Sequence, residues 1–376
     1  MYFLNGDRIY IKPEKACGTL EEQLQNCLSQ LKLINSGRKI FKLNFFVDTV
    51  SDKDYKQLQH EAGKLVSDVL SKQIVLSFIA QPPLTCNIIV EAFFYDPSLW
   101  QADFISNGKN TATHFKRENT EILIGNVQAN LGKDCEKNAE IAFADLKRIF
   151  EEKKFGTNTI VRQWNYLENI LGMDVEKQRY QEFNNVRSEF YGENFEGIGY
   201  PAATGIGMNR GGLIIEFVAI KSDNSITFPV DNPCQIAAHT YSKKVLIGDE
   251  CILKTTPKFE RARYLEMFAK KLIFISGTAS ILGEKTVGIG SPAEQTEVTI
   301  NNIRRLYSEE VIKTLSEKTL TPKYGHARVY IKNRKDFPTI KKVFKTHFGN
   351  LPVVYILADI CRNDLLVEIE GKVILE

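Results

Sequence analysis

Two glutamates near the end of the chain, Glu368 and Glu370, interrupt an otherwise apolar segment of strand length. Alternate residues of a strand share one face, so both carboxylates would lie on the same face as Leu366. This pattern is typical of a sheet face that meets water. It also fits a carboxyl group withdrawn from solvent, whose pKa rises until it holds a proton near neutral pH and acts as a general acid. Glu216, in the similar segment 213–217, is open to the same two interpretations.

Arginines beside aromatic residues form a second candidate group. The segment 161–166 places Arg162, Trp164 and Tyr166 on one strand face. Arg179, Arg187 and Arg261 follow along the chain. A guanidinium group between aromatic walls suits a carboxylate ligand, because its paired N–H donors match the two carboxylate oxygens. The alternative is a solvated arginine that lies over an aromatic edge.

Small residues mark two further segments, 197–207 and 274–281. In strands they indicate close approach of a ligand or another backbone, or tight packing between neighbouring units. A third glycine-rich segment, 288–293, loosely resembles a dinucleotide-binding turn. It does not directly follow the preceding apolar segment, so we interpret it as the entry turn of a helix. Ser291 as N-cap, with Pro292 next, supports that helix start.

Composition narrows the possible classes. The chain has 376 residues with 49 basic and 46 acidic side chains, and its net charge of +3 predicts neither nucleic-acid binding nor attraction to an acidic membrane. The histidines show no metal-binding spacing and the 7 cysteines are scattered, so we expect no metal centre and no disulfide framework. No apolar run approaches the ~18–20 residues of a membrane span, and the N-terminus lacks signal-peptide features. We therefore expect a soluble, cytoplasmic protein.

The first third of the chain alternates strands and helices. Strands are predicted over 8–12, 39–47, 74–80 and 88–95, and helices over 19–35 and 51–72. Ser51, followed by Asp54, favours a helix start at this point. From Asp103 to Glu121 the sequence turns polar, which marks a candidate domain boundary.

A degenerate repeat occupies the rest, with one copy over about 134–220 and the other over about 291–375. Each copy begins with a helix, continues into a strand that contains an arginine, and adds a second helix. A proline then introduces an extended segment, and the closing strands align Glu216 with Glu368. Two α/β units built alike should pack together or around a pseudo-symmetry axis, and two copies are too few for a solenoid.

We therefore predict an α+β (mixed α/β) fold with two α/β units in tandem, preceded by a smaller α/β N-terminal domain. The N-terminal domain would span 1–126, the first unit 127–260, and the second unit 261–376.

Short motifs at 275–280, 293–296 and 367–370 resemble the YjgF/RidA superfamily, whose units have a chorismate-mutase-like α/β fold. In that superfamily a C-terminal glutamate lines a small-molecule site between units. A larger set of ordered motifs resembles the chorismatases, which are chorismate-cleaving enzymes. These motifs lie at 162–166, 201–207, 232–237, 259–262, 276–280 and 358–362, followed by Glu368. The match covers about residues 135 to 376, and the N-terminal third offers no motif.

This resemblance implies a dicarboxylate substrate, chorismate, and an enzyme that needs no metal or organic cofactor. In the family, the catalytic glutamate that matches Glu368 protonates the terminal methylene of the enolpyruvyl ether. Water or an internal hydroxyl attacks the resulting cationic carbon, and pyruvate leaves with a hydroxybenzoate or a dihydroxycyclohexadiene carboxylate. The substrate-binding residues carried over by position are Arg162, Tyr166, Thr204, Gly205, Tyr241, Arg261 and Cys361. The protein would be a monomer or a trimer-like assembly.

Four positions depart from the family pattern. The family has an arginine where Cys234 stands, a tyrosine where His239 stands, and histidines where Glu284 and Gly288 stand. These differences leave the product and the activity open.

Two other interpretations stay open. An imine or enamine hydrolase of the RidA kind would need an arginine just ahead of the closing strand, where the segment 355–360 has none. A non-catalytic ligand-binding or assembly protein would keep the fold with a decayed site.

Overall fold

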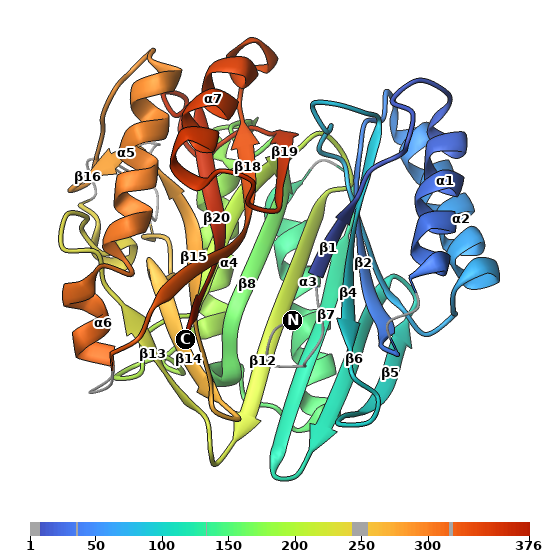
Figure 1. Ribbon diagram of the computed structural model, residues 1–376, viewed down its shortest axis with the longest axis horizontal. Helices are drawn as coiled ribbons and strands as arrows, with labels where there is room; N and C mark the ends of the chain where they lie inside the picture. The colour runs from blue at the N-terminus through green and yellow to red at the C-terminus, as the bar shows by residue number, and fades with distance from the viewer. Residues whose placement is uncertain (1–7, 35–36, 133, 243–254, 316–318) are drawn as a thin grey trace.

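The computed structural model describes residues 8–34, 37–132, 134–242, 255–315 and 319–376. Its strands form sheets that face the middle of the molecule, and its helices lie on the outside (Figure 1). The mixed α/β class predicted from the sequence is confirmed. In the described residues, no helix is both long and apolar enough to cross a membrane.

The first unit contains one four-stranded sheet with the order β1-β4-β2-β3. Its elements are β1 (Arg8–Ile11), α1 (Leu20–Leu33), β2 (Lys39–Val47), α2 (Asp52–Val69), β3 (Val75–Ile79) and β4 (Ile88–Tyr95). The two helices bury their apolar faces on this sheet in a core that includes Leu28, Phe45 and Tyr55. The Thr19 side chain caps α1 in a complete capping box, and the Ser51 side chain caps α2. All six elements predicted for this part of the chain are therefore confirmed, within a few residues at their ends.

The second unit has a six-stranded sheet with the order β11-β8-β12-β7-β6-β5. Its strands are β5 (Gln101–Asn107), β6 (Asn110–Arg117), β7 (Thr120–Ala129), β8 (Ile160–Glu168), β11 (Ala202–Met208) and β12 (Leu213–Ser222). Its helices are α3 (Cys135–Lys153) and α4 (Arg179–Tyr191). A small hairpin of β9 (Met173–Asp174) and β10 (Lys177–Gln178) precedes α4.

The polar stretch from Asp103 to Glu121, expected as a domain boundary, forms strands of this second sheet. Ala112 is buried in the core beneath α3, whereas Phe115 is buried in the core between the sheets. The stretch is therefore an integral part of the sheet and not a linker. The division into 1–126, 127–260 and 261–376 stays a prediction.

The third unit repeats the same plan, with the sheet order β13-β14-β15-β20-β18-β19. Its strands are β13 (Ile226–Val230), β14 (Ala262–Met267), β15 (Lys270–Ala279), β18 (Pro322–Ile331), β19 (Val353–Leu357) and β20 (Val367–Leu375), with a small hairpin of β16 (Ile281–Leu282) and β17 (Lys285–Thr286). Its helices are α5 (Pro292–Arg305), α6 (Glu309–Leu315) and α7 (Phe337–Phe348). Ser291 caps α5 with proline at the first position, as predicted for segment 288–293.

One connectivity, β-α-β-α-β-β, underlies all three units. It runs through β7-α3-β8-α4-β11-β12 when the β9–β10 hairpin is set aside. It also runs through β15-α5-β18-α7-β19-β20 when the short α6 and the β16–β17 hairpin are set aside. The repeat seen in the sequence is thus real. The first unit, β1-α1-β2-α2-β3-β4, is a third copy that sequence comparison missed.

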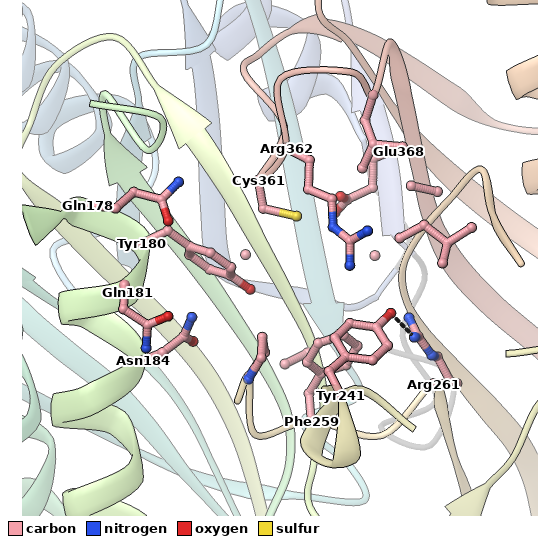
Figure 2. A pocket seen from close by; sticks show the side chains of 17 residues that line it. Gln178, Tyr180, Gln181, Asn184, Tyr241, Phe259, Arg261, Cys361, Arg362 and Glu368 are labelled. Carbon is pink, nitrogen blue, oxygen red and sulfur yellow. Dashed lines mark hydrogen bonds between the residues drawn. The ribbon is translucent and has the colours of Figure 1, made fainter. Parts of the chain in front are cut away.

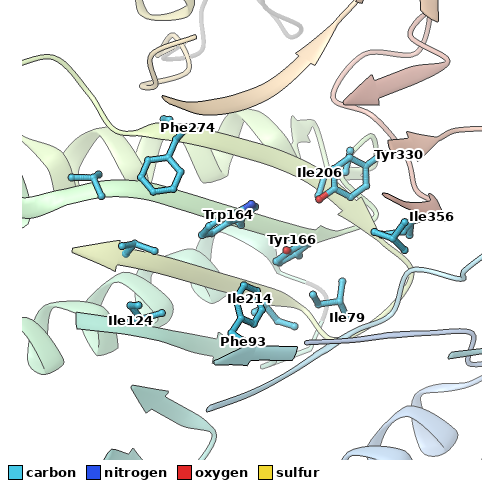
Figure 3. Packing of buried hydrophobic residues seen from close by; sticks show 14 of the residues in the cluster. Ile79, Phe93, Ile124, Trp164, Tyr166, Ile206, Ile214, Phe274, Tyr330 and Ile356 are labelled. Carbon is cyan, nitrogen blue, oxygen red and sulfur yellow. The ribbon is translucent and has the colours of Figure 1, made fainter. Parts of the chain in front are cut away.

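Side chains from all three sheets fill one central core. Phe93 of β4, Ile214 of β12 and Tyr330 of β18 belong to it (Figure 3). Burial of this shared apolar surface holds the units together, because about 25 cal/mol is gained for each Å² removed from water.

Buried ion pairs link the same three units in a cycle. Each cation lies on the second strand of the shared β-α-β-α-β-β series, which is β2, β8 or β18. Each carboxylate lies on the last strand of that series in the next unit, which is β12, β20 or β4. The pairs are Lys42–Glu216 at 3.0 Å, Arg162–Glu370 and Arg328–Glu91. All six groups are buried. Since a buried charge without a partner is costly, this ring fixes how the units sit against one another.

Candidate active site

A cavity lies between the second and third units, beside the closing strand β20 (Figure 2). Helix α4 and strand β11 line it from the second unit, and strands β15 and β20 line it from the third. Two connecting segments, ahead of β14 and ahead of β20, complete the wall. The cavity brings together most of the residues carried over from the family resemblance, namely Gly205, Tyr241, Arg261, Cys361 and Glu368.

Glu368 points into this cavity from the start of β20 and is only 4% exposed. No group in the described part of the chain donates a hydrogen bond to its carboxyl group. Burial raises its pKa to about 8 and the nearby Glu370 carboxylate adds to this, whereas Arg162 and Arg261 act in the opposite direction. The carboxyl group is therefore protonated at neutral pH, and the solvent-facing interpretation is wrong for this residue.

A β-bulge in β15 makes room for the Glu368 carboxyl group. The register between β15 and β20 shifts between Ile275 and Thr278, where Gly277 faces the acid. A methyl group added at Gly277 would lie 2.9 Å from the carboxyl carbon of Glu368. The Gly277 N–H donates to Thr204 Oγ1 at 3.1 Å, which fixes the bulge to β11. The small residues of segment 274–281 thus serve both the site and the packing between units.

Two arginines give the cavity its positive charge. The Arg261 guanidinium donates to the Ile236 carbonyl oxygen at 2.8 Å and to the Tyr241 hydroxyl (Figure 2). Arg362 Nη1 donates to the Glu284 carbonyl oxygen at 2.8 Å. Neither guanidinium forms an ion pair with a carboxylate of the described residues. Arg261 is buried and Arg362 is partly exposed. A guanidinium without a carboxylate partner can bind a ligand carboxylate, so these two can neutralise a bound ligand with two negative charges.

The remaining wall is uncharged. Tyr180 of α4 lies against Gly205, where an added methyl group would be 3.0 Å from Tyr180 Cε2. Burial raises the pKa of the Cys361 thiol to about 12, so this thiol stays protonated and acts as a wall and not as a nucleophile. Close by, α4 adds the amides of Gln181 and Asn184.

Sequence reasoning missed the contribution of α4. Its inward face is built from polar residues, so the apolar periodicity that marks a buried helix face is absent. The signal that could have found it is the spacing of Tyr180, Gln181 and Asn184, which places three hydrogen-bonding side chains on neighbouring positions of one helix face. Arg362 ends the motif at 358–362, and no pattern in the surrounding sequence marks it as a site residue.

Arg162, Tyr166 and Thr204 do not line the cavity. The Arg162 guanidinium and the Thr204 hydroxyl both bond to Glu370, and Tyr166 accepts from Arg328 at 2.7 Å in the central ring of ion pairs. Their expected contacts with a substrate stay predictions that this geometry does not support. The structure gives them a positioning role behind the cavity.

The matching place around Glu216, between the first and second units, is closed. The Glu216 carboxylate is fully buried and paired with Lys42, so it does not face water either. Where Ala279 stands opposite Glu368, Asn126 stands opposite Glu216. The Asn126 amide reaches across to the first unit and donates to the Ser77 hydroxyl at 2.8 Å. An open site therefore needs both the bulge and the small residues of β15.

The four departures from the family pattern, Cys234, His239, Glu284 and Gly288, lie outside the lining. The Glu284 carboxylate accepts from the Ser242 N–H at 2.9 Å and from its hydroxyl, while the Glu284 carbonyl oxygen holds Arg362. Cys234 is exposed. Among the described residues, no group of three His, Cys, Asp or Glu side chains could hold a metal ion.

Comparisons with known proteins identify relatives of this chain. The family model "Chorismatase FkbO/Hyg5-like, N-terminal" matches residues 98–219. A 3-hydroxybenzoate synthase of Streptomyces hygroscopicus is 31% identical over 248 residues, which cover 62% of this chain and 68% of the relative. A chorismatase of the same organism is 31% identical over 241 residues, covering 62% and 67%. A crystal structure of a chorismatase has a TM-score of 0.71 at 22% identity and covers 98% of both chains.

Fold and cavity define a class of protein built from three α/β units around one central core. A buried carboxylic acid there faces arginines that have no carboxylate partner among the described residues. The relatives give that class its family. This chain belongs to the chorismatase family.

Proposed function

We propose that this protein cleaves the enolpyruvyl ether of chorismate and releases pyruvate, with Glu368 as general acid and without a cofactor. The observation that carries the proposal is that one cavity holds both a neutral, proton-donating acid and positively charged groups. Glu368 is protonated at neutral pH, and Arg261 and Arg362 beside it have no carboxylate partner in the described chain. A dianionic substrate with an acid-sensitive vinyl ether matches both properties.

The reaction begins with transfer of the Glu368 proton to the terminal methylene carbon of the enolpyruvyl group. The electron pair of the double bond forms the new C–H bond, which leaves an oxocarbenium carbon next to the ether oxygen. The Glu368 carboxylate formed at that moment faces the positive carbon, and their attraction is strong because Glu368 is buried. Positioning of the substrate by the arginines must supply much of the acceleration, since a general acid contributes only about 10²–10⁴.

A nucleophile then attacks the oxocarbenium carbon, and cleavage of the C–O bond releases pyruvate. When the nucleophile is water, one water is consumed and a dihydroxycyclohexadiene carboxylate remains. When a hydroxyl of the substrate attacks, no net water is consumed and the other product is a hydroxybenzoate. The relative named 3-hydroxybenzoate synthase is the reason to look for 3-hydroxybenzoate first.

Pyruvate release tests the proposal directly. Purified protein is incubated with chorismate, and pyruvate is measured through NADH oxidation by lactate dehydrogenase. Mass spectrometry of the second product separates a hydroxybenzoate from a dihydroxycyclohexadiene carboxylate. Folded protein that releases no pyruvate above background would refute the proposal and favour a non-catalytic ligand-binding protein.

A further inference from the structure

Arg187 is a buried cation that the proposed reaction leaves unused. It lies on α4 behind the cavity wall and is 1% exposed. Its guanidinium carbon Cζ lies 5.1 Å from the centre of the Phe183 ring. Its Nε–H has no hydrogen-bond partner among the described residues. In the described part of the chain no carboxylate forms an ion pair with it. A buried guanidinium without a counter-charge is costly, so a role is needed to explain its retention.

The hydrogen bond from Arg187 fixes the orientation of a cavity residue. Arg187 Nη2 donates to Asn184 Oδ1 at 2.6 Å. Arginine has no acceptor atom, so the amide of Asn184 must present its oxygen to Arg187 and cannot be flipped. The Nδ2–H₂ group of Asn184 is therefore the part that remains for the cavity side.

Asn184 in turn fixes the direction of the Tyr180 hydroxyl. Its amide acts on the Tyr180 hydroxyl as a hydrogen-bond donor does and lowers the pKa of the phenol, against the larger effect of burial. Since the Asn184 oxygen faces Arg187, the Nδ2–H₂ group of Asn184 is the part that can donate to the Tyr180 oxygen. A phenol oxygen that accepts from one side directs its own proton away from that donor. No described group of the protein accepts this proton.

The Tyr180 hydroxyl lies at the centre of the site. Figure 2 shows its ring reaching from α4 into the cavity, toward the side that carries Cys361 and Glu368. Gly205 allows this position, since an added methyl group at Gly205 would lie 3.2 Å from the Tyr180 hydroxyl oxygen. The free O–H of Tyr180 therefore faces the space that a ligand must fill.

We propose that Tyr180 is a substrate-contacting residue whose hydroxyl donates a hydrogen bond to an uncharged oxygen of the substrate, and that Arg187 and Asn184 are positioning residues that set the direction of this bond. The inference rests on the proposed function and deepens it. The two carboxylates of a dianion meet Arg261 and Arg362, so the ether oxygen or a ring hydroxyl is left for Tyr180. The donor chain Arg187 to Asn184 to Tyr180 to substrate also extends the positive potential of Arg187 toward the bound ligand.

Two substitutions test the direction of the chain. Tyr180→Phe removes the final donor, and we expect kcat/KM for pyruvate release to fall about 10- to 100-fold. Asn184→Asp keeps the bond from Arg187 but has only acceptor oxygens when ionised, so the Tyr180 proton turns toward residue 184 and away from the substrate. We expect a loss of similar size, and no further loss in the double variant, because both changes remove the same bond.

Controls separate this role from a structural one. Tyr191→Phe removes a buried phenol at the other end of α4, where the hydroxyl donates to Gln163 at 2.8 Å outside the cavity, and it should leave kcat/KM unchanged. Arg187→Lys keeps a donor and a charge and should retain most of the activity. Arg187→Met removes both, and its loss in kcat/KM should be similar to that of Asn184→Asp. Thermal unfolding of every variant shows which of them fold.

The outcomes distinguish the two proposals. If the wild-type protein releases no pyruvate from chorismate, the proposed function fails. If it does release pyruvate and folded Tyr180→Phe retains activity within twofold, or if the losses from Tyr180→Phe and Asn184→Asp multiply in the double variant, the inference about Tyr180 is overturned.

Discussion

Glu370 follows Glu368 by two residues on the same face of β20, yet five groups donate hydrogen bonds to Glu370 and no described group donates to Glu368. The donors to Glu370 are Arg162, Trp164, Thr204, Arg328 and Tyr330. These donors surround the Glu370 carboxylate, and its negative charge helps to raise the pKa of Glu368. One strand thus carries a charged structural acid and a neutral acid that can deliver a proton.

The first prediction concerns the proton donor itself. Glu368→Gln keeps the size and polarity of the side chain but cannot transfer a proton, so we expect pyruvate release to fall by about two orders of magnitude or more. The fold should persist because no described group bonds to the Glu368 carboxyl. The lactate dehydrogenase assay and thermal unfolding measure the two properties on one preparation. A variant as active as wild type would place the acid elsewhere.

The second prediction follows from the raised pKa. The Glu368 carboxyl binds its proton up to a pH of about 8 in the folded chain but only up to about 4.5 when unfolded. Between these values the folded state holds one proton more, so its contribution to stability is complete below the lower value and is lost as the pH rises to the upper one. The free energy of unfolding should fall by up to about 1.4 kcal/mol per pH unit from this group. The rate of pyruvate release should also fall as the pH rises above about 8, because Glu368 then has no proton to donate.

Urea unfolding of wild type and Glu368→Gln across this interval measures the effect. Glutamine does not titrate, so the variant should gain stability relative to wild type as the pH rises. Parallel pH profiles for the two proteins would show that the Glu368 carboxyl is ionised throughout, against the prediction.

The sequence predicted local structure well, because the signals for it are local. Cap residues such as Ser51 and Ser291 and the alternation of apolar residues located helices and strands. The repeat aligned Glu216 with Glu368 and so pointed to the acid. The polar stretch 103–121 was misjudged as a boundary because short strands with buried polar residues show weak alternation.

The functions of Arg162 and Tyr166 could not be predicted from their own segment. A strand pattern tells which side chains share a face, but it does not tell which unit covers that face. The Arg162 guanidinium meets Glu370 of the third unit, and the Tyr166 hydroxyl meets Arg328 of the same unit. Only the arrangement of the units reveals that these side chains belong to the central ring and not to the cavity.

The third prediction tests the bulge that holds the acid. Gly277→Ala places a methyl group 2.9 Å from the Glu368 carboxyl carbon and 3.2 Å from Thr204 Cγ2, so the acid must shift. We expect a loss of at least about tenfold in kcat/KM, since small displacements of a catalytic group are costly. Gly63→Ala is the matched control, because it adds the same methyl group on α2 with nothing within 4 Å. The control should unfold at an equal or higher temperature and keep full activity. Equal activity of the two variants would contradict the role of Gly277.

The fourth prediction concerns the ring of ion pairs that joins the units. Lys42→Met removes the cation 3.0 Å from the fully buried Glu216 carboxylate and leaves that charge unpaired, which should cost about 3–5 kcal/mol of unfolding free energy. The same change in the exposed pair of Lys313 and Glu309, Lys313→Met, should leave the free energy of unfolding nearly unchanged, because water screens this pair. Adding Glu216→Gln to Lys42→Met removes the unpaired charge and should recover part of the loss, so the two changes are not additive. Urea unfolding of Lys42→Met, of Glu216→Gln and of the variant that carries both changes measures the coupling between the two side chains. A double variant that loses the sum of both single losses would mean that Lys42 and Glu216 do not stabilise each other, and that apolar packing alone holds the first unit against the second.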